Sequence, residues 1–192
     1  MPQIIFIGDE EQRLARRLQD GDKSAAREFY DLYADYMAGI CARYIANEED
    51  VKDVFQNALV QALSHIASFK YRGADSLKAW VAKVTVNEAL KHLRAKKRLE
   101  TLPIDCDALD EAEEDFPSIS DIPPDALRQM LSQLPAGYRT VLNLYVFEGK
   151  SHQEIASLVG IGKSSSASQL HRAKKLLAKI IRKYNDDNPT RR

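Results

Sequence analysis

The stretch SHQEIASLVGIGKSSSASQLHRAKK, residues 151–175, decides the fold of the C-terminal part of this chain. Ser151 and Glu154 have the spacing of a capping box, in which each side chain accepts a hydrogen bond from the other residue's backbone N–H at a helix start. Apolar residues follow at helical spacing, and the turn at 160–162 separates this helix from a second one that begins at Lys163. Two short helices joined by a tight glycine-containing turn predict a helix-turn-helix motif.

The second helix, from Lys163 to about Lys183, has side chains suited to DNA. Small hydroxyl-bearing residues come first, and cations follow them. In a recognition helix the N-terminal side chains meet base edges in the major groove, while flanking cations meet phosphates. The pattern therefore predicts duplex DNA binding, with a frayed helix start and a solvated cationic face as the alternative interpretations.

The rest of the chain also has helical periodicity, with apolar residues at three- and four-residue intervals. Asn47 and Ser76 are expected to cap two of these helices. Alternating strand patterns are absent from the sequence, so we predict an all-α protein. The expected helices span about 10–20, 24–45, 48–66, 76–98, 125–134, 137–147, 151–158 and 163–183.

Charge divides the chain into three parts although 28 basic and 28 acidic residues balance overall. Residues 1–99 carry a net charge of +2, residues 100–125 carry −10 without one basic residue, and residues 126–192 carry +8. The middle part also contains four prolines and no apolar face, which favours an acidic flexible linker over a loop packed on one domain. We therefore expect two small helical domains, 1–99 and 126–192, whose basic ends contact polyanions.

A second cationic segment precedes the linker. Residues 70–98 hold nine basic and two acidic residues, and Phe69, Tyr71 and Trp80 lie in or beside its loop. Cations that hold phosphates and rings that stack on bases are typical of single-stranded DNA binding. The alternative for Trp80, given its apolar position, is a place in the core.

Several classes of function lack their residues in this sequence. Cys41 and Cys106 are distant from each other and from the four histidines, so neither a zinc site nor a redox pair is indicated. Paired carboxylates, a Ser/His/Asp set and a glycine-rich phosphate loop are also missing, so we expect neither an enzyme nor a bound metal or cofactor. A span of about 18 apolar residues and a signal peptide are absent too, which indicates a cytoplasmic protein that does not insert in a membrane.

Three strings give the chain a resemblance to the sigma-70 family, specifically its extracytoplasmic-function (ECF) group. DVFQNAL at 53–59 resembles the family's polymerase-binding helix. Residues 69–98, with SLKAWV and NEALKHLR, resemble the segment that melts and reads the −10 element, and residues 134–175 resemble the −35 reader. The match covers about residues 10–99 as region 2 and 126–182 as region 4. It implies an RNA polymerase sigma factor that directs promoter-specific initiation.

The resemblance also implies partners: the clamp coiled coil of the largest subunit of bacterial core RNA polymerase, the polymerase flap, promoter DNA and an anti-sigma factor. It implies that the acidic linker lies in the RNA-exit path. The residues expected to bind polymerase are Asp50, Asp53, Gln56 and Asn57, on one polar face. The −10 residues are Tyr71, Arg72, Asp75, Ser76, Lys78, Trp80, Lys83, Asn87, Lys91 and Arg94. The −35 residues are Ser151, Lys163, Ser164, Ser165, Ser168, Gln169, His171, Arg172 and Lys175.

Some residues depart from the family pattern. Asn57 stands where Glu is usual, Ser166 puts a hydroxyl where a buried aliphatic is expected, and Ala167 replaces a usual cation. An alternative is a stand-alone helix-turn-helix regulator that binds duplex DNA without polymerase. That alternative leaves the basic segment 76–98 and the acidic linker unexplained.

Overall fold

The computed structural model describes the backbone of residues 7–96 and 116–188, with side chains from Glu10 onward, and its elements are all helices. Within these ranges no strand forms, which confirms the all-α prediction. The chain divides into two compact units, residues 1–92 and 93–192. Most of the predicted linker, residues 100–115, lies outside the described residues.

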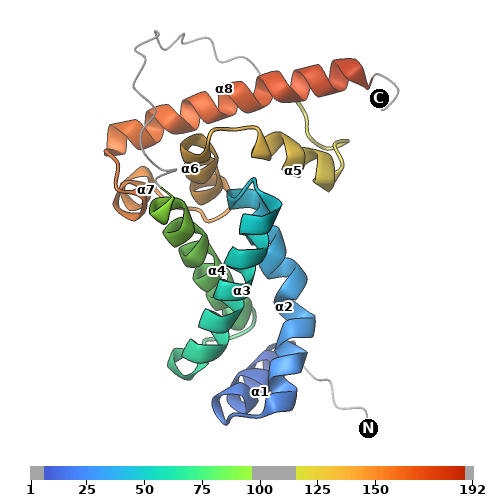
Figure 1. Ribbon diagram of the computed structural model, residues 1–192, viewed down its shortest axis with the longest axis vertical. Coiled ribbons are helices and arrows are strands. Elements are labelled where there is room, and N and C mark those ends of the chain that lie inside the picture. The colour runs from blue at the N-terminus through green and yellow to red at the C-terminus, as the bar shows by residue number, and fades with distance from the viewer. Residues whose placement is uncertain (1–6, 97–115, 189–192) are drawn as a thin grey trace. The chain divides into compact units, whose positions relative to one another are not determined.

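Unit 1 contains α1 (Ile7–Gln19), α2 (Lys23–Tyr44), α3 (Glu48–His65), a short 3-10 helix (Ile66–Ser68) and all but the last three residues of α4 (Ser76–Ala95). Helices α2 and α3 run side by side, and α1 lies at the end where α2 begins and α3 finishes (Figure 1).

Asn47 caps α3 as predicted, because its side chain accepts a hydrogen bond from the Asp50 N–H at 2.9 Å. Ser76 does not cap α4. It is the first helical residue, and its hydroxyl accepts a bond from the Arg72 N–H in the preceding loop.

Apolar side chains hold the four helices of unit 1 together. Phe29 and Met37 of α2, Ala58 of α3, and Leu77 and Val81 of α4 are all fully buried in one cluster. Burying a large apolar side chain contributes on the order of 1.5–3 kcal/mol, and burial is non-directional. The start of α4 is therefore fixed against α2 and α3 by packing.

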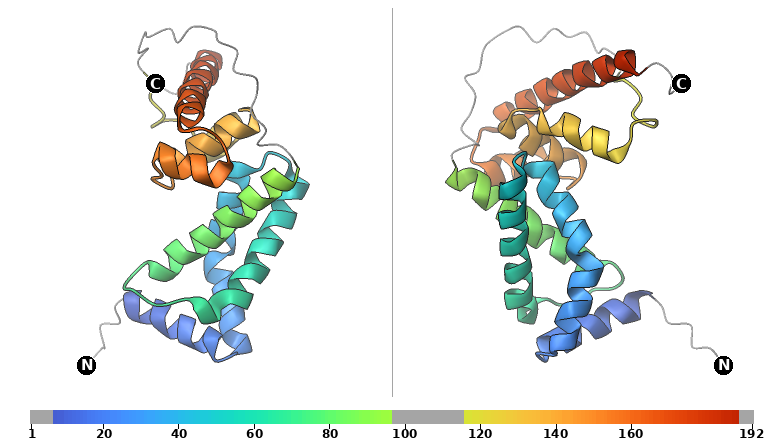
Figure 2. Two further views of the ribbon diagram at one scale, coloured as in Figure 1. Left: turned by 90° about the vertical axis from the view of Figure 1, so that its left-hand side faces the viewer. Right: turned by 45° about the vertical axis from the view of Figure 1, so that its right-hand side comes forward.

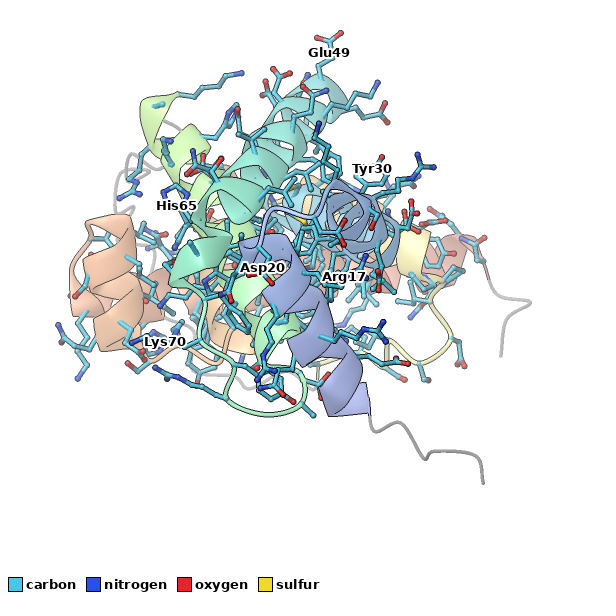
Figure 3. The ribbon with its side chains drawn as sticks, turned by 90° about the horizontal axis from the view of Figure 1, so that it is seen from below. Arg17, Asp20, Tyr30, Glu49, His65 and Lys70 are labelled. Atoms are coloured by element: carbon cyan, nitrogen blue, oxygen red, sulfur yellow. The ribbon has the colours of Figure 1, made fainter. Side chains whose placement is uncertain are left out.

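The corner between α1 and α2 is built from charged side chains. Arg17, labelled in Figure 3, lies 2.8 Å from the Asp22 carboxylate and 2.5 Å from Glu28. Asp22 is also the N-cap of α2 and accepts bonds from the hydroxyl and backbone N–H of Ser24. The Ser24 hydroxyl first, and then Arg17, lower the pKa of Asp22 from 3.8 to about 2.

Unit 2 contains α5 (Pro124–Ser132), α6 (Ala136–Val146), α7 (His152–Val159) and α8 (Lys163–Asp187). The three shorter helices contact one side of the long α8 (Figure 2).

The predicted capping box of α7 is confirmed. The Ser151 N–H donates to the Glu154 carboxylate at 2.8 Å, and the Glu154 N–H donates to the Ser151 hydroxyl at 3.3 Å. Helix α7 then ends at Gly160, whose φ of 80° is a left-handed conformation that favours glycine.

The core of unit 2 mixes apolar and polar side chains. Leu144, Ile155 and Ile181 are almost completely buried. Arg139 and Asn143 of α6 are buried with them; Arg139 Nη1 donates to the Ser132 carbonyl, and Asn143 Nδ2 donates to the Arg139 carbonyl. These bonds give the unit directional contacts in addition to packing.

Candidate nucleic-acid and partner surfaces

Helix α3 presents a polar face to solvent. Asp53, Gln56 and Asn57 are exposed, while Val54 and Ala58 are buried on the opposite side of the same helix. Three of the four residues predicted to bind polymerase therefore share one accessible surface.

Asp50 is not on that surface, which corrects the sequence analysis. It is only 8% exposed, and its carboxylate lies 3.5 Å from Nε2 of His92 on α4. The spacing could have revealed this, because Asp50 precedes the buried Val54 by four residues and so lies on the same stripe of the helix. The helix N-terminus also favours a carboxylate at this position.

Helix α4 carries an exposed polar stripe. Lys83, Asn87, Lys91 and Arg94 are exposed and follow one another at intervals of four, four and three residues, so they lie on one face. Lys78 is on another side, with its ammonium 5.2 Å from the ring centroid of Tyr36 on α2. The predicted −10 cations on α4 therefore separate into a stripe and one lysine against α2.

The loop before α4 has a defined shape. Asp75 adopts a left-handed conformation with φ 61°, which costs a non-glycine residue on the order of 1–2 kcal/mol. The loop is closed by bonds from the Ser76 N–H to the Gly73 carbonyl and from the Arg72 N–H to the Ser76 hydroxyl. Glu11 of α1 adds a carboxylate 3.4 Å from the Leu77 N–H, near the helix start. These contacts fix the loop although its own residues are mostly polar.

The aromatic residues of this region take different positions. Trp80 is half-buried and packs on Phe69, with ring centroids 5.6 Å apart and planes at 57°. Tyr71 is also half-buried against the core of unit 1. The alternative that places Trp80 in the core is therefore supported. The exposed cations of the loop before α4 are Lys70 and Arg72.

The N-terminal part of α8 presents the expected face. Ser164, Ser168, His171 and Lys175 fall on one side of the helix and are exposed or half-exposed. No side chain caps the N-terminus at Gly162, so the first backbone N–H groups of α8 are not occupied by a capping residue. Of the other predicted residues, Lys163 is exposed, Ser165 and Arg172 are half-buried, and the exposed Ser151 is engaged in the capping box.

Gln169 departs from the predicted position. It is 9% exposed, on the side of α8 that faces α6, where its Oε1 lies 3.2 Å from the place that a Cβ on Gly137 would occupy. A base contact by Gln169 would require the side chain to leave this interior site. The sequence signal was its spacing from the buried Ala173, four residues further on and so on the same side of the helix.

Ser166 is fully buried, as the family position implies, but its hydroxyl is paired. It lies 3.0 Å from Nδ1 of His152 at the start of α7. The sequence analysis did not predict this contact, which depends on how two helices meet.

Within the ranges 10–96 and 116–188, no group of three or more His, Cys, Asp or Glu residues could hold a metal ion. The helices of this described part also include none long and apolar enough to cross a bilayer.

Comparison with known proteins matches both units. The family model for sigma-70 region 2 matches residues 29–99, and that for sigma-70 region 4 matches residues 125–177. The RNA polymerase sigma-H factor of Pseudomonas aeruginosa is 29% identical over 191 residues, covering 92% of this chain and 96% of that protein. The ECF RNA polymerase sigma-E factor of Haemophilus influenzae is 27% identical, covering 89% and 95%.

A solved structure of CnrH in complex with the cytosolic domain of CnrY covers 90% of this chain and 97% of that chain at 20% identity, with a TM-score of 0.49. The two family models occur in the order of regions 2 and 4, and the relatives align over nearly their whole length. The chain therefore belongs to the sigma-70 family of RNA polymerase sigma factors, in its ECF group.

Proposed function

We propose that this sigma factor uses residues 1–99 to dock on core polymerase and to read and melt the −10 element, and residues 126–192 to read the −35 element. The observation that carries the proposal is that each unit presents its own exposed helix face of DNA-binding type, on α4 and on α8. A stand-alone regulator needs one such face, and the second would have no role in it.

The docking face for polymerase is the exposed part of α3, formed by Asp53, Gln56 and Asn57. Glu48 and Glu49 extend the negative charge at the start of the helix, and Figure 3 shows Glu49 extending outward there. A polar, acidic helix face suits a basic helical partner such as the clamp coiled coil of the largest subunit.

The −10 element would meet α4 and the loop that precedes it. The stripe of Lys83, Asn87, Lys91 and Arg94 would follow the phosphates, and the loop at 70–76 would receive a base flipped from the non-template strand. Unstacking a base costs a few kcal/mol, and a loop already held in one shape lowers the additional cost of ordering the protein.

The −35 element would meet the exposed face of α8. Ser164, Ser168 and His171 would reach base edges, and the uncapped N–H groups at the helix start would bind a phosphate, as helix N-termini do. Lys175 and Arg172 would contact the flanking backbone.

The flap of polymerase would bind unit 2 elsewhere, in an apolar groove of about 310 Å³. This groove suits an amphipathic helix, which buries its apolar face in such a site. The acidic linker, with residues 97–115 outside the described ranges, would lie in the RNA-exit path, and an anti-sigma factor would hold the chain inactive. The groove is lined by Phe116, Ile119, Leu127, Leu131, Leu142, Val146, Phe147, Lys174 and Leu177.

The test is initiation by purified core polymerase with and without the chain, on a library of promoter fragments. Initiation at defined start sites only when the chain is added supports the proposal. Equal retardation of duplex DNA with and without polymerase would instead favour the stand-alone regulator.

Two variants, each with a control, test which helix face binds polymerase and which binds the −35 element. Asp53→Ala is expected to weaken core binding by roughly 1 kcal/mol, about fivefold, while Asp35→Ala, an exposed acid on α2, leaves it unchanged. Arg172→Ala is expected to weaken −35 binding and flatten its salt dependence by roughly 0.9 log units per log unit of salt, while Lys179→Ala, an exposed cation further along α8, does not.

A further inference from the structure

Ser166 differs from other serines of the helix-turn-helix in the direction of its hydroxyl. Ser157 and Ser168 donate back to the carbonyl four residues earlier in their own helices, Gln153 and Ser164. The Ser166 hydroxyl instead meets Nδ1 of His152 across the interface between α8 and α7, at 3.0 Å. With no exposed surface, Ser166 cannot use water as a partner, so this bond satisfies a hydroxyl that would otherwise be buried without a hydrogen bond.

The imidazole of His152 is held on a second side. It stacks on the ring of Tyr145 from α6, with centroids 5.0 Å apart and planes at 22°. A planar ring between a stacking partner and a hydrogen-bond partner has little freedom to rotate. His152 therefore connects α6 to α8 through two contacts of defined geometry.

We propose that His152 is a positioning residue for −35 recognition: through Ser166 it fixes the rotation of α8 about its own axis, and Tyr145 holds His152 in place. The inference rests on the proposed function, since it concerns how α8 reads DNA. Tyr145 and His152 would thus contribute to sequence discrimination without touching a base.

The geometry explains why such a contact matters at this position. Ser166 lies between Ser164 and Ser168, two residues of the DNA face, within one turn of the helix. Because side chains extend about 5 Å from the helix axis, a rotation of about 10° moves their ends by on the order of 1 Å. A hydrogen bond is directional and resists that rotation, whereas the aliphatic contact usual in the family permits more of it.

Two substitutions at one position separate the hydrogen bond from the stacking. His152→Phe keeps a ring against Tyr145 but offers no hydrogen-bonding group to Ser166. His152→Asn offers an amide group, able to accept or to donate, near the place of Nδ1 but loses the ring. Ser166→Ala removes the other partner of the bond with little change in volume.

The assay uses holoenzyme formed from core polymerase and the full-length chain. Initiation is measured on a promoter that the unmodified holoenzyme transcribes and on every single-base change of its −35 element. His152→Phe and Ser166→Ala are expected to reduce the discrimination between the parent and the changed elements by about tenfold at the most sensitive base pair, roughly one base contact. His152→Asn is expected to retain most of the discrimination, and His152→Phe with Ser166→Ala together should lose no more than either alone.

A second measurement uses NMR on the full-length chain without polymerase. The ¹⁵N chemical shift of His152 Nδ1 reports its hydrogen bond, and this signal should change in Ser166→Ala while the amide spectrum of unit 1 stays unchanged. Unaltered discrimination in folded His152→Phe and Ser166→Ala proteins would overturn the inference, as would an equal loss in His152→Asn and His152→Phe. Absence of initiation with the unmodified chain would refute the proposed function instead, so the two failures are distinguishable.

Discussion

The two units hold the helices that we propose to face DNA in different ways. In unit 1, the first half of α4 is held by Leu77 and Val81, and its buried hydroxyl, on Thr85, bonds back to its own helix at the Val81 carbonyl. The contact between His92 and Asp50 of α3 lies near the C-terminal end of α4. In unit 2, α8 is held by apolar residues together with the buried Ser166, whose hydroxyl lies 3.0 Å from Nδ1 of His152 on α7. Apolar burial is non-directional, whereas a hydrogen bond also depends on the direction of its donor and acceptor. Under the proposed function, the difference would suit a helix that follows a strand in unit 1 and a helix that reads base edges in unit 2.

The largest expected effect comes from a substitution in the apolar core of unit 1. Phe29 of α2 is fully buried, and its ring centroid lies 5.1 Å from that of Tyr33. Phe29→Ala should therefore lower the free energy of unfolding of unit 1 by about 3–5 kcal/mol. Cys41 provides the measurement, because burial raises the pKa of its thiol to about 12 and protects it from alkylation until unit 1 opens. Alkylation of Cys41 in a Cys106→Ser background should therefore accelerate.

Leu32→Ala is the matched control, on the same helix at 62% exposure, and should leave the alkylation rate unchanged. Hydrogen exchange of the buried amides of α8 should be unaffected by Phe29→Ala. Parallel loss of protection in both units would contradict separate cores.

The second expected effect concerns the buried carboxyl group of Asp50 in unit 1. Asp50→Ala removes the partner of His92 and should destabilise unit 1 by about 1–2 kcal/mol, measured by denaturant unfolding. Asp53→Ala, one turn along on the exposed face, should leave stability within about 0.5 kcal/mol. Equal stability of the two variants would show that the Asp50 contact contributes nothing.

The third expected effect tests a local polar contact in unit 2. Ser151→Ala breaks the capping box of α7 and should cost about 1 kcal/mol, seen as faster amide exchange in α7. Ser157→Ala removes only a bond to a carbonyl of the same helix and should have little effect. Bonds from Ser151 also lower the pKa of Glu154, so this contribution is present above the ordinary carboxyl range and is lost as the pH falls below it.

The smallest expected effect is at the α1–α2 corner. Because the folded pKa of Asp22 is lowered from 3.8 to about 2, its contribution to stability is complete above about pH 4 and is lost as the pH falls through 2. An NMR titration of the Asp22 carboxyl should give a midpoint near 2. Ser24→Ala should raise that midpoint toward its usual value, while Ser64→Ala, an exposed serine on α3, should not.

Local signals in the sequence predicted much of this structure. Asn47 and Ser151 act as caps where their spacing placed them, and apolar periodicity located the helices to within a few residues. Helix α1 begins three residues before the predicted position. Helix α8 continues four residues beyond its predicted end, through a mostly polar turn at 184–187 that gives no periodic apolar signal.

The positions that the sequence did not predict are those set by a neighbouring helix. The burial of Asp50 is completed by His92, 42 residues away, and the pairing of Ser166 depends on His152, 14 residues away. Periodicity shows that a residue lies on an inner face but not which polar group it will meet there. The contact residues for DNA and polymerase remain predictions for the same reason, because their partners are other molecules.

Trp80 gives the chain an optical reporter that needs no label. It is the single tryptophan of the sequence, it is half-buried on Phe69, and the loop at 70–76 adjoins it. Unit 2 contains no other indole to dilute the signal. A shift in emission when an oligonucleotide is added would therefore arise from unit 1, so the proposed capture of a single strand by this loop can be tested by intrinsic fluorescence in the intact protein.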